Sequence, residues 1–275
     1  MESPRKALLG ELAAMLSTSW GNPGNPATIE PEFIPRDRAE AYLVQDLMHE
    51  TLAQGIAGWK VGATSTRMRE LDGHDDVIPG RIFASRTWVG SRHDLPIEYF
   101  RGARVETEFA FRLTETPHLR DTPWTAGEME QMMVLHPAVE IIGNRFRLNG
   151  AGKAENSLMT IADNGGGIGF VFGDPVDDWQ TVDFQQHVIT LTVNNGVPAD
   201  NFLGDMRCLP SQAAADLVNH LADRGHALAA GDYISTGAAT VPQAFSGGDH
   251  VHADFGALGA IELVFGSDSM KPGDQ

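Results

Sequence analysis

The fold is decided by the stretch Arg104-Val-Glu-Thr-Glu-Phe-Ala-Phe111, in which apolar and polar residues alternate. Successive side chains of a strand point to opposite faces, so Val105 and the odd-numbered residues after it, up to Leu113, can pack inward. Glu106 and Glu108 are then neighbours on the opposite face. The pattern predicts a strand over residues 105–113 that carries two carboxylates on one side.

A third acid, Glu140, lies in the apolar run His136-Pro-Ala-Val-Glu-Ile-Ile142. Burying several ionised carboxylates together is costly, because each raises the pKa of the others unless a cation compensates. Mg²⁺ or Mn²⁺ prefers carboxylate oxygens and keeps positions open for water or substrate. Glu106, Glu108 and Glu140 therefore form a candidate catalytic metal site. The alternative is that Glu106 and Glu108 lie on a solvated strand face and Glu140 at a strand end.

The composition is that of a globular protein, with 275 residues, 42% of them hydrophobic and 21% charged. A net charge of −17 argues against nucleic-acid binding, which needs Lys and Arg to neutralise phosphates. Cys208 is the single cysteine, so an intramolecular disulfide and a cysteine zinc cluster are excluded. Neither a secretory signal nor a membrane-spanning run is recognisable. We expect a cytoplasmic protein without membrane contact.

The order of expected elements predicts the fold class. Helical spacing of apolar residues appears at 7–16, 36–54, 126–135 and 211–224, and short strands are expected at 58–63, 81–84, 105–113, 138–142, 167–172, 187–193, 233–236, 250–255 and 260–265. Asn194-Asn195-Gly196 is a hairpin turn signal. Strands in succession with few helices between them favour an α+β fold, a mixed β-roll or sandwich core flanked by N-terminal helices. A soft boundary near residue 95 separates an N-terminal helical and cap region, 1–95, from a β-rich catalytic core, 96–275, unless the chain is one domain.

Lys60 lies between glycines in the strand-like run Gly58-Trp-Lys-Val-Gly62. Strand alternation places it on the face opposite Trp59 and Val61. If it is partly desolvated, its pKa falls and it can move a proton; if it stays charged, it can hold a substrate carboxylate. The alternative is a surface lysine on an edge strand.

Two glycine-containing segments are weaker candidates. Asp163-Asn-Gly-Gly-Gly167 matches neither a P-loop nor a dinucleotide fingerprint, but its small residues would let the backbone and Asp163 approach a ligand. Thr236, Gly237 and Ala238 end a strand and form a plausible cradle for an anion. In both places an ordinary turn or loop is the other interpretation. No Gly-x-Ser-x-Gly elbow is present, which disfavours a serine hydrolase.

Together, these segments resemble the 2-oxopent-4-enoate hydratase and 4-oxalocrotonate decarboxylase family of the fumarylacetoacetate hydrolase superfamily. The resemblance covers residues 35–265 and rests on the order and spacing of five motifs: Gly58-Trp-Lys-Val-Gly-Ala-Thr-Ser, Arg104-Val-Glu-Thr-Glu-Phe-Ala, Pro137-Ala-Val-Glu-Ile-Ile, Ala162-Asp-Asn and Gly231-Asp-Tyr-Ile-Ser-Thr-Gly-Ala.

The resemblance implies a mixed β-roll, a bound Mg²⁺ or Mn²⁺, and a role in the breakdown of short 2-oxo or 2-hydroxydienoic acids from aromatic or steroid rings. It implies that Glu106, Glu108 and Glu140 are the metal ligands. It makes Lys60 and Asp163 the catalytic residues, and it places Thr236, Gly237 and Ala238 against the substrate. The reaction it implies is the addition of water to a 2-hydroxy-2,4-dienoate, giving a 4-hydroxy-2-oxo acid. Homo-oligomers are common among the relatives, so a homo-oligomer is expected.

Two departures from the family pattern leave other reactions open. Ile78 stands where family hydratases commonly carry an acid, and Leu209 stands where they carry a histidine. Decarboxylation of a 4-oxalocrotonate-like acid, or C–C hydrolysis of a diketo acid, would use the same metal and enolate chemistry. A protein that binds an oxo acid without catalysis, or a partner of another pathway enzyme, is a further alternative. An intact glutamate triad beside Lys60 favours an enzyme over binding alone.

Overall fold

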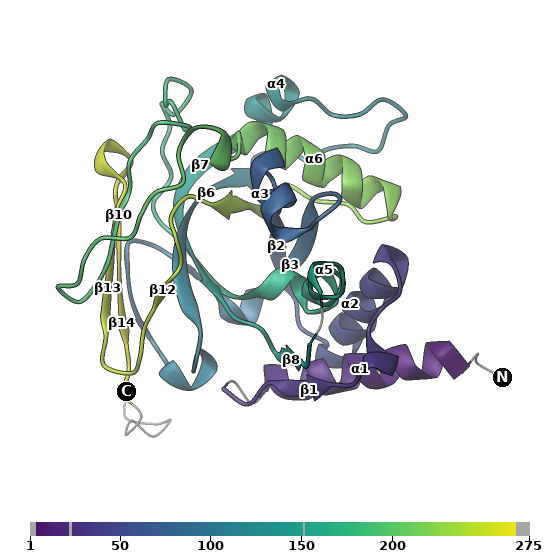
Figure 1. Cartoon of the computed structure of the whole chain (residues 1–275). Coiled ribbons are helices and arrows are strands. Elements are labelled where there is room, and N and C mark those ends of the chain that lie inside the picture. The colour runs from purple at the N-terminus through teal and green to yellow at the C-terminus, as the bar shows by residue number, and fades with distance from the viewer. Residues whose placement is uncertain (1–3, 22–23, 151, 268–275) are drawn as a thin grey trace.

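A computed structural model describes residues 4–21, 24–150 and 152–267 and confirms the α+β class (Figure 1). Its largest sheet has eight strands that curl around the middle of the molecule, in the order β3-β2-β11-β6-β7-β9-β4, with β12 paired to β6. These strands are β2 (Ile56–Gly62), β3 (Ile78–Phe83), β4 (Thr87–Val89), β6 (Arg104–Leu113), β7 (Met133–Ile142), β9 (Gly167–Phe172), β11 (Tyr233–Ala238) and β12 (Gln243–Ala244).

A four-stranded sheet packs against the large one and makes the sandwich. Its strands, in the order β10-β13-β14-β5, are β10 (Thr190–Val193), β13 (His250–Asp254), β14 (Ala260–Phe265) and β5 (Arg92–Leu95). Val105 and Phe109 of β6 share one hydrophobic core with Leu191, Val251 and Leu263 of the smaller sheet, and all five are at most 1% exposed. The odd-numbered residues of β6 therefore face the core as predicted, which leaves Glu106 and Glu108 on the other face.

Helices cover the rest of the large sheet. A second core joins α1 (Pro4–Trp20), α2 (Arg38–Leu52) and α5 (Lys153–Ala162) to the small sheet of β1 (Ala27–Ile29) and β8 (Phe146–Leu148). At the top of Figure 1, α6 (Pro210–Asp223) lies beside α4 (Ala126–Met129) and contacts β2 and β11, and α3 (Thr66–Asp72) lies below it. Within the described residues, none of the helices has the length and apolarity needed to cross a bilayer.

The prediction of a helix over 126–135 is wrong in its second half. The α-helix ends at Met129, a 3-10 turn covers Glu130–Met132, and β7 begins at Met133. Met133 and Leu135 pair with Leu113 and Phe111 of β6, so pairing with a neighbouring strand overrides the helical spacing. The helices α3 and α5 were not expected. The sequence does contain the end signals of α3: Ser65 caps its first turn, and Gly73 ends it at a φ of 78°.

The turn predicted at residues 194–196 is present, with Gly196 N donating to Val193 O. The returning segment is not a strand, however, and β10 pairs instead with β13, about sixty residues further along. The division near residue 95 stays a prediction. Strands that precede this position pair with strands that follow it: β2 with β11, and β5 with β14.

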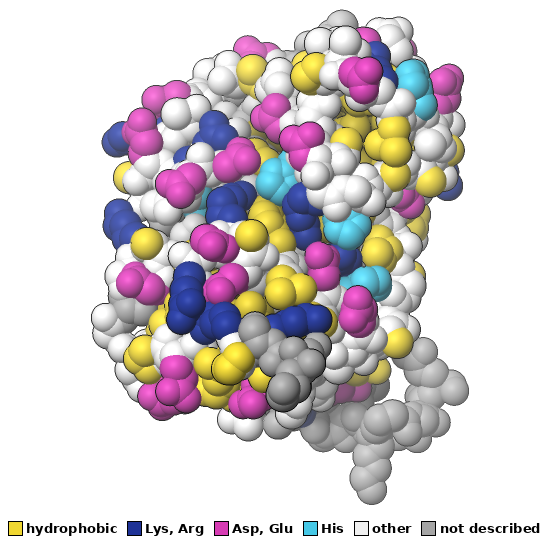
Figure 2. All heavy atoms as spheres, turned by 90° about the vertical axis from the view of Figure 1, so that its right-hand side faces the viewer, with side chains coloured by type: hydrophobic (Ala, Val, Ile, Leu, Met, Phe, Trp, Pro, Cys, Tyr) yellow, Lys and Arg dark blue, Asp and Glu magenta, His cyan; other side chains and the backbone are white. Residues whose placement is uncertain are grey.

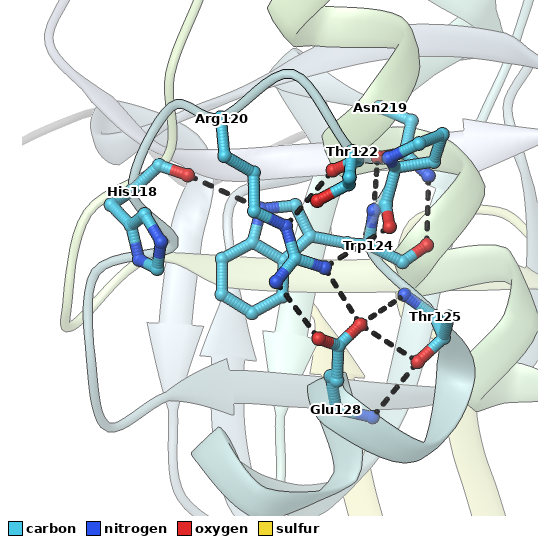
Figure 3. A network of polar contacts seen from close by, with 8 residues as sticks. His118, Arg120, Thr122, Trp124, Thr125, Glu128 and Asn219 are labelled. Atoms are coloured by element: carbon cyan, nitrogen blue, oxygen red, sulfur yellow. Dashed lines mark hydrogen bonds and ion pairs between the residues drawn. The ribbon is translucent and has the colours of Figure 1, made fainter.

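A polar network fixes the long connection between β6 and β7 (Figure 3). Asn219 of α6 accepts from Trp124 N at 2.8 Å and donates to Trp124 O at 2.9 Å. Arg120 lies 3.9 Å over the Trp124 ring and makes a bidentate ion pair with Glu128, at 2.8 and 2.7 Å. The connection is thereby held against α6.

Acidic and basic side chains share one face of the molecule. On the face shown in Figure 2, Lys, Arg and His side chains gather across the middle, with Asp and Glu side chains around them and hydrophobic side chains between. The net charge therefore does not define the potential inside any one cavity.

Candidate metal centre

Three carboxylates meet on the side of the large sheet that faces away from the sandwich core. Glu106 and Glu108 lie two residues apart on β6, and Glu140 of β7 is directly opposite Glu106. One oxygen of each carboxylate lies within 4.8 Å of one oxygen of both others. Glu106, Glu108 and Glu140 are 6%, 1% and 0% exposed, so the alternative of a solvated strand face is wrong.

Glu108 is held in place by β11. Its Oε2 accepts a hydrogen bond from Ser235 Oγ and another from Gly237 N, the latter at 3.0 Å. The pairing of β11 with β6 shifts register between Ser235 and Ala238, which brings this backbone N–H to the carboxylate. Gly237 has a φ of 112°, and a Cβ there would lie 2.6 Å from Thr64 Oγ1, so only glycine fits.

Lys60 of β2 reaches the same cluster. Its Nζ lies 3.4 Å from Glu140 Oε1, and the residue is 7% exposed, so the surface-lysine alternative is wrong. Its side-chain stem passes against two glycines: a Cβ at Gly80 would lie 3.3 Å from Lys60 Cδ, and one at Gly165 would lie 3.2 Å from it. The glycines on β3 and in the loop after α5 make room for this side chain.

The charges of the cluster shift one another's pKa values. Burial and the charge of Glu108 raise the pKa of Glu106 to about 8, against the opposing effect of Lys60. Burial also raises the pKa of Glu140 well above 4.5, although Lys60 again opposes the shift. Burial lowers the pKa of Lys60, but the three carboxylates outweigh it and the net shift is upward. Of the two possibilities for Lys60, the upward shift of its pKa favours the charged ammonium group over the lowered pKa.

The donor set fits a hard divalent cation. Neither carboxylate oxygen of Glu140 has a hydrogen-bond partner among the described residues, although both are buried. Three carboxylates face a single ammonium group, so further positive charge would stabilise the cluster. In catalytic sites, Mg²⁺ and Mn²⁺ bind oxygen ligands and keep some coordination positions open for water or substrate.

The cluster opens into two adjoining cavities that share the residues Lys60, Gly62, Ala63, His74 and Glu106. One, of about 410 Å³, is here called the polar arm and includes Ile78, Arg104, Asn144 and Thr160. The other, of about 250 Å³, is called the apolar arm and includes Met68, Phe202, Met206 and Pro242. Glu106 and Lys60 thus lie where two differently lined passages meet, Glu108 lines the apolar arm, and Glu140 lies behind them.

Asp163 is not brought to this cluster. It is fully buried, its Oδ1 accepts from Arg145 Nε at 2.5 Å, and its Oδ2 accepts from Arg145 N at 2.8 Å. It lines neither arm. The next residue, Asn164, bonds the backbone N and O of Arg81 on β3 through its side chain, which sets Gly165 against Lys60.

The expected substrate segment is only partly exposed to the cavity. Gly237 and Ala238 line the apolar arm, whereas Thr236 is fully buried and its hydroxyl donates to Phe109 O at 2.6 Å. Of the two departures from the family pattern, Ile78 lines the polar arm, and Leu209 is 55% exposed and lines neither arm.

Sequence reasoning did not single out Ser235, Asn144, His74 or Arg104 as individual site residues. The sequence could have identified Arg104, because it precedes Glu106 by two residues and strand alternation places both side chains on one face. The other three lie on elements whose proximity depends on sheet order and loop conformation.

The comparisons with known proteins came from sequence and from structure. No family model matches the chain. A 4-oxalocrotonate decarboxylase of Pseudomonas sp. is 31% identical over 210 residues, 75% of this chain and 77% of the relative. A 2-keto-4-pentenoate hydratase of Paraburkholderia xenovorans LB400 is 25% identical over 259 residues, 90% of this chain and 91% of the relative.

Solved structures share the fold. The 4-oxalocrotonate decarboxylase from Pseudomonas putida G7, complexed with magnesium and adipate, superposes with a TM-score of 0.80 at 21% identity and covers 96% of this chain and 99% of its own. A fumarylpyruvate hydrolase from Pseudomonas aeruginosa, in complex with Mn²⁺ and pyruvate, gives a TM-score of 0.53 at 13% identity and covers 76% and 89%.

Proposed function

The chain belongs to the family of 2-keto-4-pentenoate hydratases and 4-oxalocrotonate decarboxylases, in the fumarylacetoacetate hydrolase superfamily, and on that premise we propose that it is a divalent-metal-dependent lyase of short 2-oxo acids. The observation that carries the proposal is the buried cluster of Glu106, Glu108 and Glu140 beside Lys60, open to a two-armed cavity. Burying such a cluster is costly unless a cation compensates its charge, and groups with strongly shifted pKa values concentrate at functional sites.

Glu106, Glu108 and Glu140 would hold Mg²⁺ or Mn²⁺, the ions named with two structural neighbours. When bound, the ion supplies Lewis-acid stabilisation of negative charge on the oxygen of a 2-oxo acid. Ser235 Oγ and Gly237 N fix the orientation of Glu108 by occupying its Oε2. Outer hydrogen bonds of this kind position a ligand before the metal arrives.

Lys60 is the group of this chain that can move a proton. Its ammonium lies 3.4 Å from Glu140 and its side chain lines both arms, so as a charged group it can donate a proton to the carbon chain of a bound 2-oxo acid. Asp163 acts through Arg145 and the following turn, which makes it a positioning residue in this proposal. Gly237 and Ala238 line the passage for the substrate.

The first reaction proposed is the hydration of 2-hydroxypenta-2,4-dienoate to 4-hydroxy-2-oxopentanoate. In this reaction the dienol rearranges to a conjugated enone, and water then adds at C4. The second candidate is decarboxylation of a 4-oxalocrotonate-like acid, which is favoured by the 31% identity to a decarboxylase. We place the reaction in the cytoplasmic breakdown of ring-cleavage products, carried out by a homo-oligomer, as the family resemblance implies.

The test follows the ultraviolet absorbance of 2-hydroxypenta-2,4-dienoate and, separately, of 2-oxohex-3-enedioate. Purified protein is assayed with Mg²⁺ or Mn²⁺, with EDTA and with the Glu108→Gln variant as controls. Metal-dependent loss of the dienoate, with 4-hydroxy-2-oxopentanoate detected by mass spectrometry, supports the hydratase. Release of CO₂ from the enedioate supports the decarboxylase. Metal binding with turnover of neither acid would contradict the proposed function.

A further inference from the structure

An imidazole lies in the part of the cavity that both arms share. His74 belongs to the loop between α3 and β3, and it lines both arms together with Lys60 and Glu106. The residue is half-buried. Imidazole is the side chain that most readily gains and loses a proton near neutral pH. A small acid bound at the carboxylates therefore shares its cavity with a group suited to proton transfer.

The His74 ring is held by α5 through one of its two nitrogens. His74 Nδ1 lies 2.6 Å from Oγ of Ser157, which is 6% exposed and lines neither arm. In the tautomer whose Nδ1–H donates to this hydroxyl, the lone pair lies on Nε2. Because Nδ1 points to a residue outside the cavity, Nε2 is the ring nitrogen that can serve a bound molecule.

The other titratable groups of the two arms are poor proton acceptors. Besides Lys60 and His74, the described residues that line the arms include four titratable side chains: Arg104, Glu106, Glu108 and Cys208. The two glutamates are metal ligands in the proposed function, and an arginine stays protonated in proteins. Burial raises the pKa of the Cys208 thiol to about 11, so the thiol keeps its proton. His74 is thus the neutral base that the cavity offers.

We propose that His74 is the general base that takes a proton from the water added at C4 of bound 2-oxopent-3-enoate. This inference rests on the proposed function, in its hydratase form. In the first step of that reaction, Lys60 gives a proton to C5 and takes back the proton of the 2-hydroxyl group, so it is again an ammonium group when water adds. An ammonium group cannot accept another proton, and the water therefore needs a different acceptor.

His74 can complete the addition without a further proton donor. The water oxygen forms a bond to C4, the electron pair of the C3=C4 bond moves along the chain toward the 2-oxo oxygen, and one proton of the water passes to His74 Nε2. The imidazolium then returns a proton to C3 as the 2-oxo group forms again, which leaves neutral His74 and 4-hydroxy-2-oxopentanoate. Ser157 is a positioning residue, because its Oγ can accept from Nδ1 in both charge states of the ring.

The experiment separates the two steps in His74→Asn, whose amide can bond Ser157 but cannot accept a proton. 2-Hydroxypenta-2,4-dienoate is supplied to the Mn²⁺-loaded protein, its loss is followed by ultraviolet absorbance, and the products are identified by NMR. We expect loss of the dienoate near the wild-type rate, but formation of 4-hydroxy-2-oxopentanoate should fall about 100-fold, as for loss of a general base, so that 2-oxopent-3-enoate accumulates. Mn²⁺ affinity should be unchanged. His74→Ala should show the same defect, and added imidazole should restore hydration.

His93→Asn is the matched control, because His93 is also half-buried, has one ring nitrogen bonded to Gly90 O, and lines neither arm. Both of its rates should match those of the wild type. Unchanged hydration in His74→Asn, equal loss of both steps, or a His74→Ala variant that imidazole does not restore would overturn the inference. A wild type that releases CO₂ from 2-oxohex-3-enedioate but does not hydrate 2-oxopent-3-enoate would overturn the inference alone. A wild type that consumes none of these acids would overturn the proposed function.

Discussion

Glu106 and Glu140 occupy directly opposed positions on the antiparallel strands β6 and β7. Like charges in such a pair destabilise a sheet, and here both carboxylates are buried. Glu108 adds a third acid two residues away, and within the described residues Lys60 supplies the only ammonium group in contact with the cluster. The sheet therefore carries a local electrostatic cost at the place where the chemistry is proposed.

Removing one carboxylate of the opposed pair should raise the stability of the metal-free protein and weaken metal binding. In Glu140→Gln, we expect the metal-free protein to melt at a higher temperature above about pH 8, where Glu106 is ionised, because a buried like-charge repulsion is gone. Mn²⁺ affinity should fall by at least about 100-fold, because a ligand oxygen is lost. Calorimetric titration and thermal melts in EDTA measure the two effects. Glu262→Gln on the exposed side of β14 is the control, and unchanged Mn²⁺ affinity in Glu140→Gln would refute the ligand assignment.

The raised pKa of Glu106 predicts a pH dependence of stability. In the folded chain burial and Glu108 raise this pKa from 4.5 to about 8, so the folded state keeps a proton that the unfolded chain has lost. The free energy of unfolding of the metal-free protein should therefore fall as pH rises from about 4.5 to about 8, by up to about 1.4 kcal/mol per pH unit. Urea unfolding in EDTA at several pH values measures this slope. Glu106→Gln should make it shallower, with Glu140 supplying the rest, and an unaltered slope in that variant would contradict the pKa assignment.

Ser235 should affect the metal site without being a ligand. Its hydroxyl donates to Glu108 Oε2, together with Gly237 N. Ser235→Ala should weaken Mn²⁺ binding about 10-fold, the lower end of what outer hydrogen bonds supply. Equilibrium dialysis with Mn²⁺ provides the measurement. Ser85→Ala, which removes an exposed hydroxyl bonded to Gln54, should have no effect. If both variants bind Mn²⁺ like the wild type, Ser235 does not position Glu108.

Lys60 should be needed for turnover more than for binding of the metal. Lys60→Met keeps the volume of the stem between Gly80 and Gly165 but removes the ammonium group. We expect kcat to fall by about 100-fold or more, as for loss of a positioned acid or base. Steady-state rates and Mn²⁺ titrations should be compared with those of Lys153→Met, a lysine outside both arms. Unchanged kcat in Lys60→Met would refute its role in proton transfer.

Replacing Asp163 should lower the stability of the fold more than it lowers kcat. Asp163→Asn leaves Arg145 buried without its carboxylate partner, which costs about 3–5 kcal/mol in a buried ion pair. Chemical unfolding measures this loss, and kcat at a temperature where the variant is folded should fall less than in Lys60→Met. A large loss of kcat with unchanged stability would instead restore Asp163 to a direct catalytic role.

The local sequence pattern was sufficient to predict many residues of the candidate metal centre. Alternation along 105–113 predicted which side chains of β6 enter the core, and Glu106, Glu108, Glu140 and Lys60 were singled out because charged groups stood where apolar strands were expected. Asp163 was singled out because of the glycine-rich turn that follows it and the family resemblance, but the segment alone could not reveal Arg145, which lies 18 residues away. The helix predicted at 126–135 was wrong because its second half pairs with β6.

The sequence by itself determined the strand pattern, the α+β class and the presence of acids in buried positions, because these depend on residue spacing along the chain. Tertiary structure alone decided that Glu140 lies opposite Glu106, that Ser235 and Gly237 hold Glu108, and that Arg104 and His74 line the cavity. Strand register, sheet order and the path of loops bring together residues that are distant in sequence, and no local spacing encodes those distances.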